Sequence, residues 1–105
     1  MNKILKIPFA AFNNNWDDLQ LFLKHRGNPP YEITDDLNLR FSDIKTLGNL
    51  TSVGGGLNLF ESNIKSLGNL TSVGGYLYLG KTPLSRKYTE EKIRSMIEVR
   101  HKIYF

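Results

Sequence analysis

The sequence contains no cysteine, only two histidines and no long apolar run. Without cysteine, a chain of 105 residues has no disulfide, no thiolate metal site and no cysteine nucleophile. The apolar stretch from Ile4 to Ala11 is interrupted by Lys6 and Pro8. It is much shorter than the roughly 18 apolar residues of a membrane span and is too broken for an export signal. We therefore expect a cytoplasmic protein that has no membrane contact.

The residue patterns of common catalytic and metal sites are also missing. His25 and His101 lie far apart and belong to no metal-ligand spacing such as HExxH. Neighbouring carboxylates such as Asp35 and Asp36 point in different directions on a strand or helix. The glycines form neither GxGxxG nor GxxxxGK[ST], the loops that hold phosphates. We therefore expect no catalytic residue, no metal, no cofactor and no small-molecule substrate, so the protein is predicted not to be an enzyme.

Basic residues are concentrated in the C-terminal part of the chain. Residues 1–80 carry seven basic and seven acidic side chains, whereas residues 81–105 carry seven basic and three acidic ones, which accounts for the net charge of +4. A local excess of this kind favours an acidic partner or a phosphate backbone, and the competing interpretation is ordinary solvated surface charge. The candidate basic patch consists of Lys81, Arg86, Lys87 and Arg94.

The dominant feature is an internal repeat of twenty residues. Residues 37–56 read LNLRFSDIKTLGNLTSVGGG and residues 57–76 read LNLFESNIKSLGNLTSVGGY, which differ at five places. A third copy begins at Leu77 and then departs from the pattern. Repeats of this length are typical of stacked units that bury their apolar faces against each other. The Leu-x-Leu start predicts a strand, and the later spacing of three predicts a turn-like return.

The pattern L-x-L-x-x-S-x-I-x-x-L-x-x-L-x-x-V resembles the leucine-rich repeat, in a short variant that covers roughly positions 33–84. The S-V-G-G before each strand is similar to the receptor L-domain type. Where leucine-rich repeats carry asparagine, this chain has Ser42, Ser62 and Thr82, so hydroxyls must bond the turn backbone. Such short repeats also resemble those of small phage and bacterial proteins, which implies a binding module of that origin.

The flanking segments are predicted to cap the repeats. Two helix starts are predicted, one at Asn15, which precedes Trp16, Asp17 and Asp18, and one at Thr89, which precedes Glu90 and Glu91. Lys3–Phe9 and Ile103–Phe105 are predicted strands at the sheet edge or, alternatively, partner-binding surface. The predicted fold class is an α+β repeat, a short leucine-rich-repeat-like solenoid of 20-residue coils. Its single domain, 1–105, comprises an N-terminal strand and helix cap (1–36), repeat coils (37–86) and a C-terminal helical cap (87–105).

Side chains that alternate with the inward leucines define a candidate binding face. With Leu37 and Leu39 inward, their neighbours point outward, because successive side chains on a strand face opposite sides. Exposed aromatic residues on such a face favour partner binding. The alternative is that the C-terminal helix folds over them and buries them. The predicted partner-binding residues are Asp36, Asn38, Arg40, Asn58, Phe60, Tyr76 and Tyr78.

These observations lead to one main functional hypothesis and two alternatives. The main hypothesis is a non-catalytic protein-binding module, such as a phage-encoded inhibitor that covers a surface of a host enzyme or of a defence complex of the CRISPR type. The first alternative is a protein that binds nucleic acid or a ribonucleoprotein through the basic C-terminal segment, with Tyr78, Tyr88, Tyr104 and Phe105 as stacking contacts. The second is self-assembly through a strand edge or the sheet face.

Overall fold

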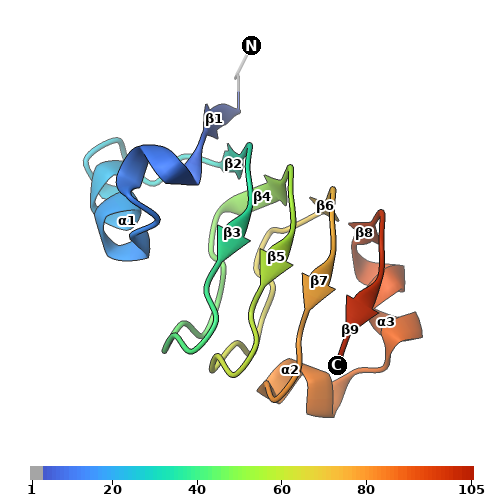
Figure 1. Ribbon diagram of the computed structural model, residues 1–105. Helices are drawn as coiled ribbons and strands as arrows, with labels where there is room; N and C mark the ends of the chain where they lie inside the picture. Colours follow the sequence, from blue (N-terminus) through green and yellow to red (C-terminus); the bar gives the residue numbers. More distant parts are fainter. Residues whose placement is uncertain (1–3) are drawn as a thin grey trace.

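The computed structural model describes residues 4–105, which fold into two parallel β-sheets and three α-helices (Figure 1). The five-stranded sheet has the order β1 (Leu5–Ile7), β2 (Tyr31–Ile33), β4 (Leu50–Val53), β6 (Ser72–Val73) and β8 (Glu98–Val99). The four-stranded sheet has the order β3 (Leu37–Asn38), β5 (Leu57–Asn58), β7 (Leu77–Tyr78) and β9 (Ile103–Tyr104).

The strands of the four-stranded sheet pair at the spacing of the sequence repeat. Leu37 lies opposite Leu57, and Leu57 lies opposite Leu77, which in turn lies opposite Ile103. In the other sheet, Val53 lies opposite Val73. Because equivalent residues of successive repeats are neighbours, each buried side chain stacks on a residue of similar size and shape.

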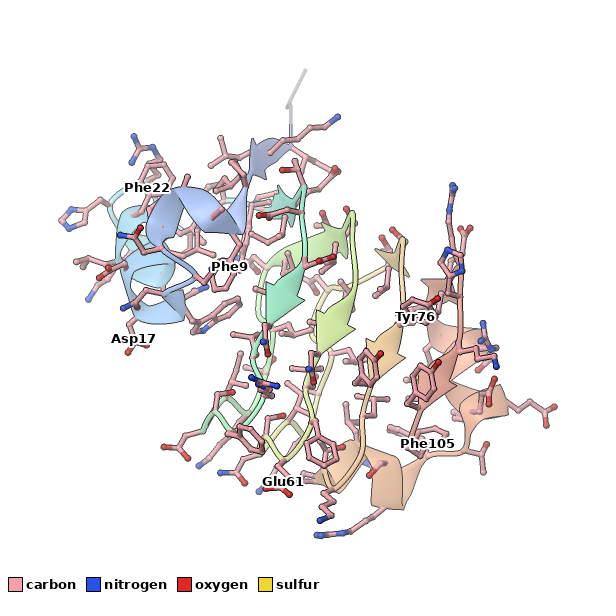
Figure 2. All side chains as sticks on the ribbon, viewed as in Figure 1. Phe9, Asp17, Phe22, Glu61, Tyr76 and Phe105 are labelled. Atoms are coloured by element: carbon pink, nitrogen blue, oxygen red, sulfur yellow. The ribbon has the colours of Figure 1, made fainter. Side chains whose placement is uncertain are left out.

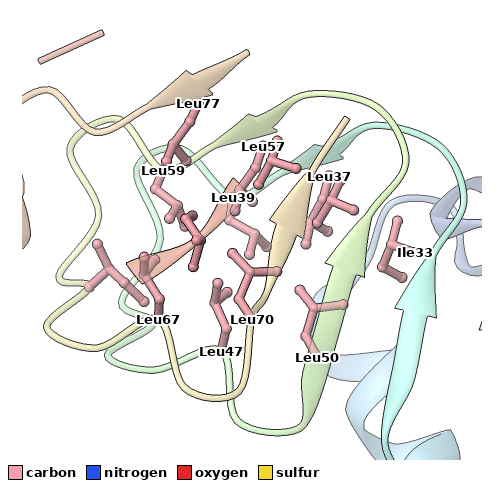
Figure 3. Close-up of a cluster of buried hydrophobic side chains, with 14 of the residues drawn as sticks. Ile33, Leu37, Leu39, Leu47, Leu50, Leu57, Leu59, Leu67, Leu70 and Leu77 are labelled. Carbon is pink, nitrogen blue, oxygen red and sulfur yellow. The ribbon is translucent and has the colours of Figure 1, made fainter. Parts of the chain in front are cut away.

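The hydrophobic core lies between the two sheets. Figure 3 shows leucines of β3, β5 and β7 pointing toward leucines of the segments that return to the other sheet. Leu37, Leu57 and Leu77 are fully buried. Burial of a leucine side chain stabilises the fold by about 1.5–3 kcal/mol, so this ladder supplies much of the driving force for folding.

Helices cover both ends of the two sheets. The short 3₁₀ helix η1 (Phe9–Phe12) and α1 (Trp16–Lys24) lie at the β1 end, and α2 (Pro83–Lys87) and α3 (Glu90–Met96) lie at the β9 end (Figure 1). The predicted N-caps are confirmed: Asn15 Oδ1 accepts from the Asp18 N–H at 3.1 Å, and Thr89 Oγ1 accepts from the Lys92 N–H at 3.2 Å. None of the helices within residues 4–105 has the length and apolar character needed to cross a membrane.

Ser42, Ser62 and Thr82 occupy equivalent positions of the three repeats, and at two of these positions the hydroxyl group bonds the turn backbone. The Ser42 and Thr82 hydroxyls each donate to the carbonyl three residues earlier, at 2.6 Å. The Ser62 hydroxyl is buried, and it has no hydrogen-bond partner among the residues that the structure describes. The predicted role of hydroxyls in place of amides is therefore confirmed for Ser42 and Thr82.

The predicted fold class is wrong. The sequence predicts an α+β repeat, a short solenoid of 20-residue coils with an N-terminal strand and helix cap and a C-terminal helical cap. The structure is instead a small compact α/β domain with two parallel sheets and a Cα radius of gyration of 12.9 Å. The return segments contain β4 and β6, which form part of a second sheet. The flanks supply strands to both sheets, because the edge N–H and C=O groups of a sheet are satisfied by another strand and not by a helix.

The two predicted terminal strands are observed in shortened form. Strand β1 occupies Leu5–Ile7 and pairs with β2, whereas Lys3 lies outside the described residues. Strand β9 occupies Ile103–Tyr104 and pairs with β7. The C-terminal flank is thus not purely helical, since after α3 the chain returns through β8 and β9.

Candidate functional site

The solvent-facing side of the four-stranded sheet, here called the outer face, carries three of the predicted binding residues in a row with Tyr104. Asn38, Asn58, Tyr78 and Tyr104 are cross-strand neighbours on β3, β5, β7 and β9. The leucine ladder fixes this arrangement, because Leu37, Leu57 and Leu77 occupy the opposite side of the same strands. Sequence reasoning therefore placed Asn38, Asn58 and Tyr78 on one face, as the structure does.

Three tyrosines, Tyr76, Tyr78 and Tyr104, form what we call the tyrosine cluster. The rings of Tyr78 and Tyr104 are stacked with centroids 4.7 Å apart and planes 11° apart. The ring centroid of Tyr76 lies 6.4 Å from that of Tyr78 and 5.9 Å from that of Tyr104. The His101 ring centroid lies 5.2 Å from that of Tyr76. Figure 2 shows Tyr76 at the end of the sheet where β7 and β9 lie. Two neighbouring strands and the segment that leads into β9 therefore build one aromatic surface.

The tyrosine cluster is open to solvent. Tyr76 is 44% exposed, Tyr78 37% and Tyr104 40%. The C-terminal helix does not cover these rings; α3 contacts β8, which belongs to the five-stranded sheet. Of the two interpretations that the sequence left open, exposure on the outer face is the one observed.

Polar side chains on β3 and β5 border an open groove next to the cluster. The groove has a volume of about 460 Å³, and Asp36, Asn38, Gly56, Asn58, Tyr76, Tyr78 and His101 are among its lining residues. Asp36 Oδ1 accepts from the Gly56 N–H at 2.8 Å. The Asn38 and Asn58 side-chain oxygens accept from the N–H groups two residues later, at 3.2 and 3.0 Å. These bonds hold the three polar side chains in fixed positions. The side-chain amide nitrogens of Asn38 and Asn58 remain as donors.

Arg40 and Phe60 lie farther along the outer face, where the strands turn. Phe60 is half-buried, and its ring meets that of Phe41 edge-on at 6.0 Å. The Arg40 guanidinium lies 5.6 Å from the Phe41 ring. The Lys81 ammonium lies 5.8 Å from the Phe60 ring and pairs with Glu61 at 3.4 Å. The outer face thus has a second aromatic group, which is flanked by cations.

The predicted basic patch is only partly available for binding. Arg94 donates to Glu90 at 3.0 Å and to the carbonyl groups of Val99 and His101 at 2.9 and 2.7 Å, so its guanidinium holds the connection between β8 and β9. The Lys81 charge is shared with Glu61. Arg86 and Lys87 lie in the last turn of α2 and are exposed. The four residues therefore have separate roles, and Arg94 has a structural one.

The sequence analysis did not place three residues of this face, His101, Phe41 and Tyr104. Phe41 is 62% exposed and has a φ of 60°, which is unfavourable for a bulky residue. Its equivalents in the next two repeats are Glu61 and Lys81, so an apolar residue at a polar position was a usable signal. His101 had no such signal, because its position depends on how the chain returns to form β9.

Tyr31 differs from the tyrosine cluster because it belongs to the core. It lies on β2 with 1% of its surface exposed, and its hydroxyl accepts a hydrogen bond from Gln20 Nε2 at 3.1 Å. Burial raises the pKa of Tyr31 to about 12, because the phenolate would lose its hydration, and the bond from Gln20 opposes this effect in part. Tyr31 is therefore a neutral core residue at physiological pH.

Comparisons with known proteins give no match to a family model, to a curated protein or to a solved structure. The resemblance of the repeat to the leucine-rich repeat stays a prediction. Any function therefore has to follow from the geometry of the outer face.

Proposed function

We propose that the chain is a non-catalytic protein-binding module and that the outer face is its binding surface. The observation that carries this proposal is the tyrosine cluster, in which three neighbouring aromatic side chains are each about two-fifths exposed. Tyrosine is enriched at interface hot spots, because its ring buries a large apolar area and its hydroxyl still forms a hydrogen bond. An aromatic group beside fixed polar side chains has the composition of such an interface.

The rigidity of the face supports the same proposal. Tyr78 and Tyr104 hold each other by stacking, and the Asn38 and Asn58 side chains are held by bonds to their own backbone. Binding therefore immobilises few additional rotamers, and ordering each free side chain would cost about 0.5–1.5 kcal/mol. A surface fixed in advance retains more of its contact energy as affinity.

We also propose the setting in which this module acts. It works in the cytoplasm as an inhibitor of phage origin, and it covers a surface of a host enzyme or a defence complex. The resemblance of its repeats to those of small phage and bacterial proteins supports this part. Inhibition by covering a surface requires contact area and hot-spot residues and needs no catalytic group.

Binding of nucleic acid or a ribonucleoprotein is the alternative proposal, supported by the basic excess after residue 80. Two observations weigh against it. The Arg94 guanidinium is engaged in internal bonds, and the stack of Tyr78 on Tyr104 occupies ring faces that a base would need. Salt separates the two proposals, because affinity for a phosphate backbone falls steeply with salt, whereas an aromatic interface changes little.

The experiment compares partner recovery and stability in variants of the outer face. Tagged wild-type protein is expressed in its native host, and proteins that copurify are quantified by mass spectrometry. Tyr78→Ala should weaken partner binding by about 2 kcal/mol, or roughly 30-fold, while its melting temperature changes little. Lys87→Glu is the comparison for the basic segment and should retain the partner. Full binding by Tyr78→Ala together with loss of binding in Lys87→Glu would refute the proposal in favour of nucleic acid.

Self-association is distinguished by the mass of the wild-type protein across a range of concentrations. Strands β3 and β9 are the edges of the four-stranded sheet, and edges are the sites where copies of a chain pair. We expect a constant monomer mass in sedimentation velocity. A mass that rises with concentration, and that Tyr104→Ala returns to the monomer value, would assign the tyrosine cluster to a contact between copies.

A further inference from the structure

Gly56 gives the outer face a position without a side chain between a carboxylate and an aromatic ring. Asp36, Gly56 and Tyr76 are neighbours across β3, β5 and β7, because Leu37 N–H donates to the Gly56 carbonyl and Leu57 N–H to the Tyr76 carbonyl. All three residues line the groove of about 460 Å³. We call the space above Gly56, between Asp36 and Tyr76, the Gly56 slot.

The fold itself does not require glycine at position 56. All nine glycines lie in the described part of the chain, and eight of them have a positive φ or leave no room for a Cβ atom. At Gly56 the nearest atom to an added Cβ would be the Tyr76 carbonyl oxygen at 3.4 Å, an ordinary contact, and φ is not positive. A side chain is thus tolerated there, and its absence keeps the slot open.

The walls of the slot favour a planar cation. The Gly56 N–H binds one Asp36 oxygen at 2.8 Å, and a carboxylate has acceptor sites on both oxygens, so the second oxygen remains available. On the other wall, the aromatic neighbours of Tyr76 are Tyr78 on β7, Tyr104 on β9 and His101 just before β9. None of these rings comes from β5, so no aromatic neighbour in the described part of the chain covers the side of Tyr76 next to Gly56, and both residues line the groove.

We propose that the Gly56 slot binds the guanidinium group of an arginine side chain presented by the protein partner. A guanidinium donates in a fork to a carboxylate and also stacks on an aromatic ring, whereas a lysine ammonium is a compact, strongly hydrated charge. The amide nitrogens of Asn38 and Asn58, which line the same groove, are donors for the backbone carbonyl groups beside that arginine. This inference rests on the proposed protein-binding function and specifies the chemistry of the partner.

The first test is a titration of the ¹⁵N-labelled wild-type protein, followed by NMR. The probe is N-acetyl-L-arginine methylamide, and the comparison probes are the citrulline analogue, which lacks the charge, and the lysine analogue. The arginine probe should shift the amide signals of Gly56, Leu57 and Tyr76 and saturate with a Kd on the order of 1 mM. The other two should bind at least about tenfold more weakly. Equal binding of the citrulline or lysine analogue, or no binding of the arginine probe, would overturn the inference.

The second test uses substitutions that change the slot and preserve the fold. Asp36→Asn keeps the acceptor for the Gly56 N–H and removes the charge, and Gly56→Val fills the slot. Each should weaken binding of the arginine probe by at least about tenfold. Asp43→Asn, which removes an exposed charge elsewhere, is the matched control and should bind like the wild type. A separate titration uses methyl glucoside as an uncharged probe. If it shifted the amide signals of Gly56, Leu57 and Tyr76 equally in the wild type and in Asp36→Asn, the slot would be assigned to a sugar instead.

Failure of this inference is distinguishable from failure of the proposed function. If Tyr78→Ala loses the copurified partner while Asp36→Asn retains it fully, the outer face binds protein but the slot does not take arginine. If Tyr78→Ala retains the partner, the proposed function itself fails. Loss of the partner in both variants, with retention by Asp43→Asn, is the result that we expect.

Discussion

Replacing Gly74 with alanine measures how closely successive segments of the chain pack, because Gly74 lies directly against Gly54. Its N–H donates to the Val53 carbonyl at 2.8 Å. A Cβ atom added to Gly74 would meet the Gly54 carbonyl oxygen at less than the 3.0 Å that real Cβ atoms keep. The obstacle is rigid backbone, so the two segments must separate to accommodate the methyl group.

The expected cost follows from two contributions. Overpacking in a close-packed region costs about 1–3 kcal/mol. Separation of the segments also weakens the bond from Gly74, and a backbone hydrogen bond contributes about 0.5–1.5 kcal/mol. Gly74→Ala should therefore destabilise the protein by about 2–4 kcal/mol. For a chain of this size, that corresponds to a melting temperature lower by roughly 10 °C or more.

Gly56→Ala is the matched control, because its added methyl group meets only ordinary contacts. Both substitutions restrict the unfolded chain to the same extent, so the difference between the two variants reports the folded state alone. The assay is thermal and urea denaturation followed by far-UV circular dichroism. If Gly74→Ala were as stable as Gly56→Ala, the close approach of Gly54 and Gly74 would be incorrect.

Three further outcomes are expected. Leu59→Ala should cost about 2–5 kcal/mol in urea denaturation and Lys65→Ala less than about 0.5 kcal/mol, because only the leucine is buried; similar costs would contradict the inward ladder. Asp35→Ala should cost about 2 kcal/mol, since the Asp35 carboxylate accepts from the Phe9 N–H at 2.6 Å and holds the start of η1; an unchanged denaturation midpoint would exclude that role. Because the folded-state pKa of Tyr31 is about 12 and the unfolded value is 10.0, the unfolded state binds fewer protons between these pH values. The free energy of unfolding should therefore fall with rising pH in that window, by up to about 1.4 kcal/mol per pH unit, and Tyr31→Phe should lack this component.

The parts of the structure that depend on local pattern could be predicted from the sequence. Leucine recurs at positions 37 and 57, and the pairing register of β3 and β5 places these two identical side chains next to each other. The alternation around these leucines placed Asn38, Asn58 and Tyr78 on the outer face. The caps at Asn15 and Thr89 were predictable because they need only a side-chain oxygen and an N–H group three residues later.

The remaining features depend on contacts between distant segments. The spacing of three between Leu47, Leu50 and Val53 indicates a turn, yet residues 50–53 form β4 because neighbouring segments offer backbone partners on both sides. The completion of the tyrosine cluster by Tyr104 depends on the pairing of β9 with β7, which the repeat does not reach. Arg94 belongs to the same class, since its partners Val99 and His101 come together only after the chain turns back.

The sheet topology has a consequence for how the chain folds. Every strand of the described chain pairs with strands that lie about twenty or somewhat more residues away in sequence, and no strand pair joins the first third of the chain to the last. The separation is too long for fast local folding, so the rate belongs with that of β-rich domains, in the range of milliseconds to seconds. Because each strand needs only its predecessor as a template, the sheets can grow in sequence order during synthesis, one strand after another.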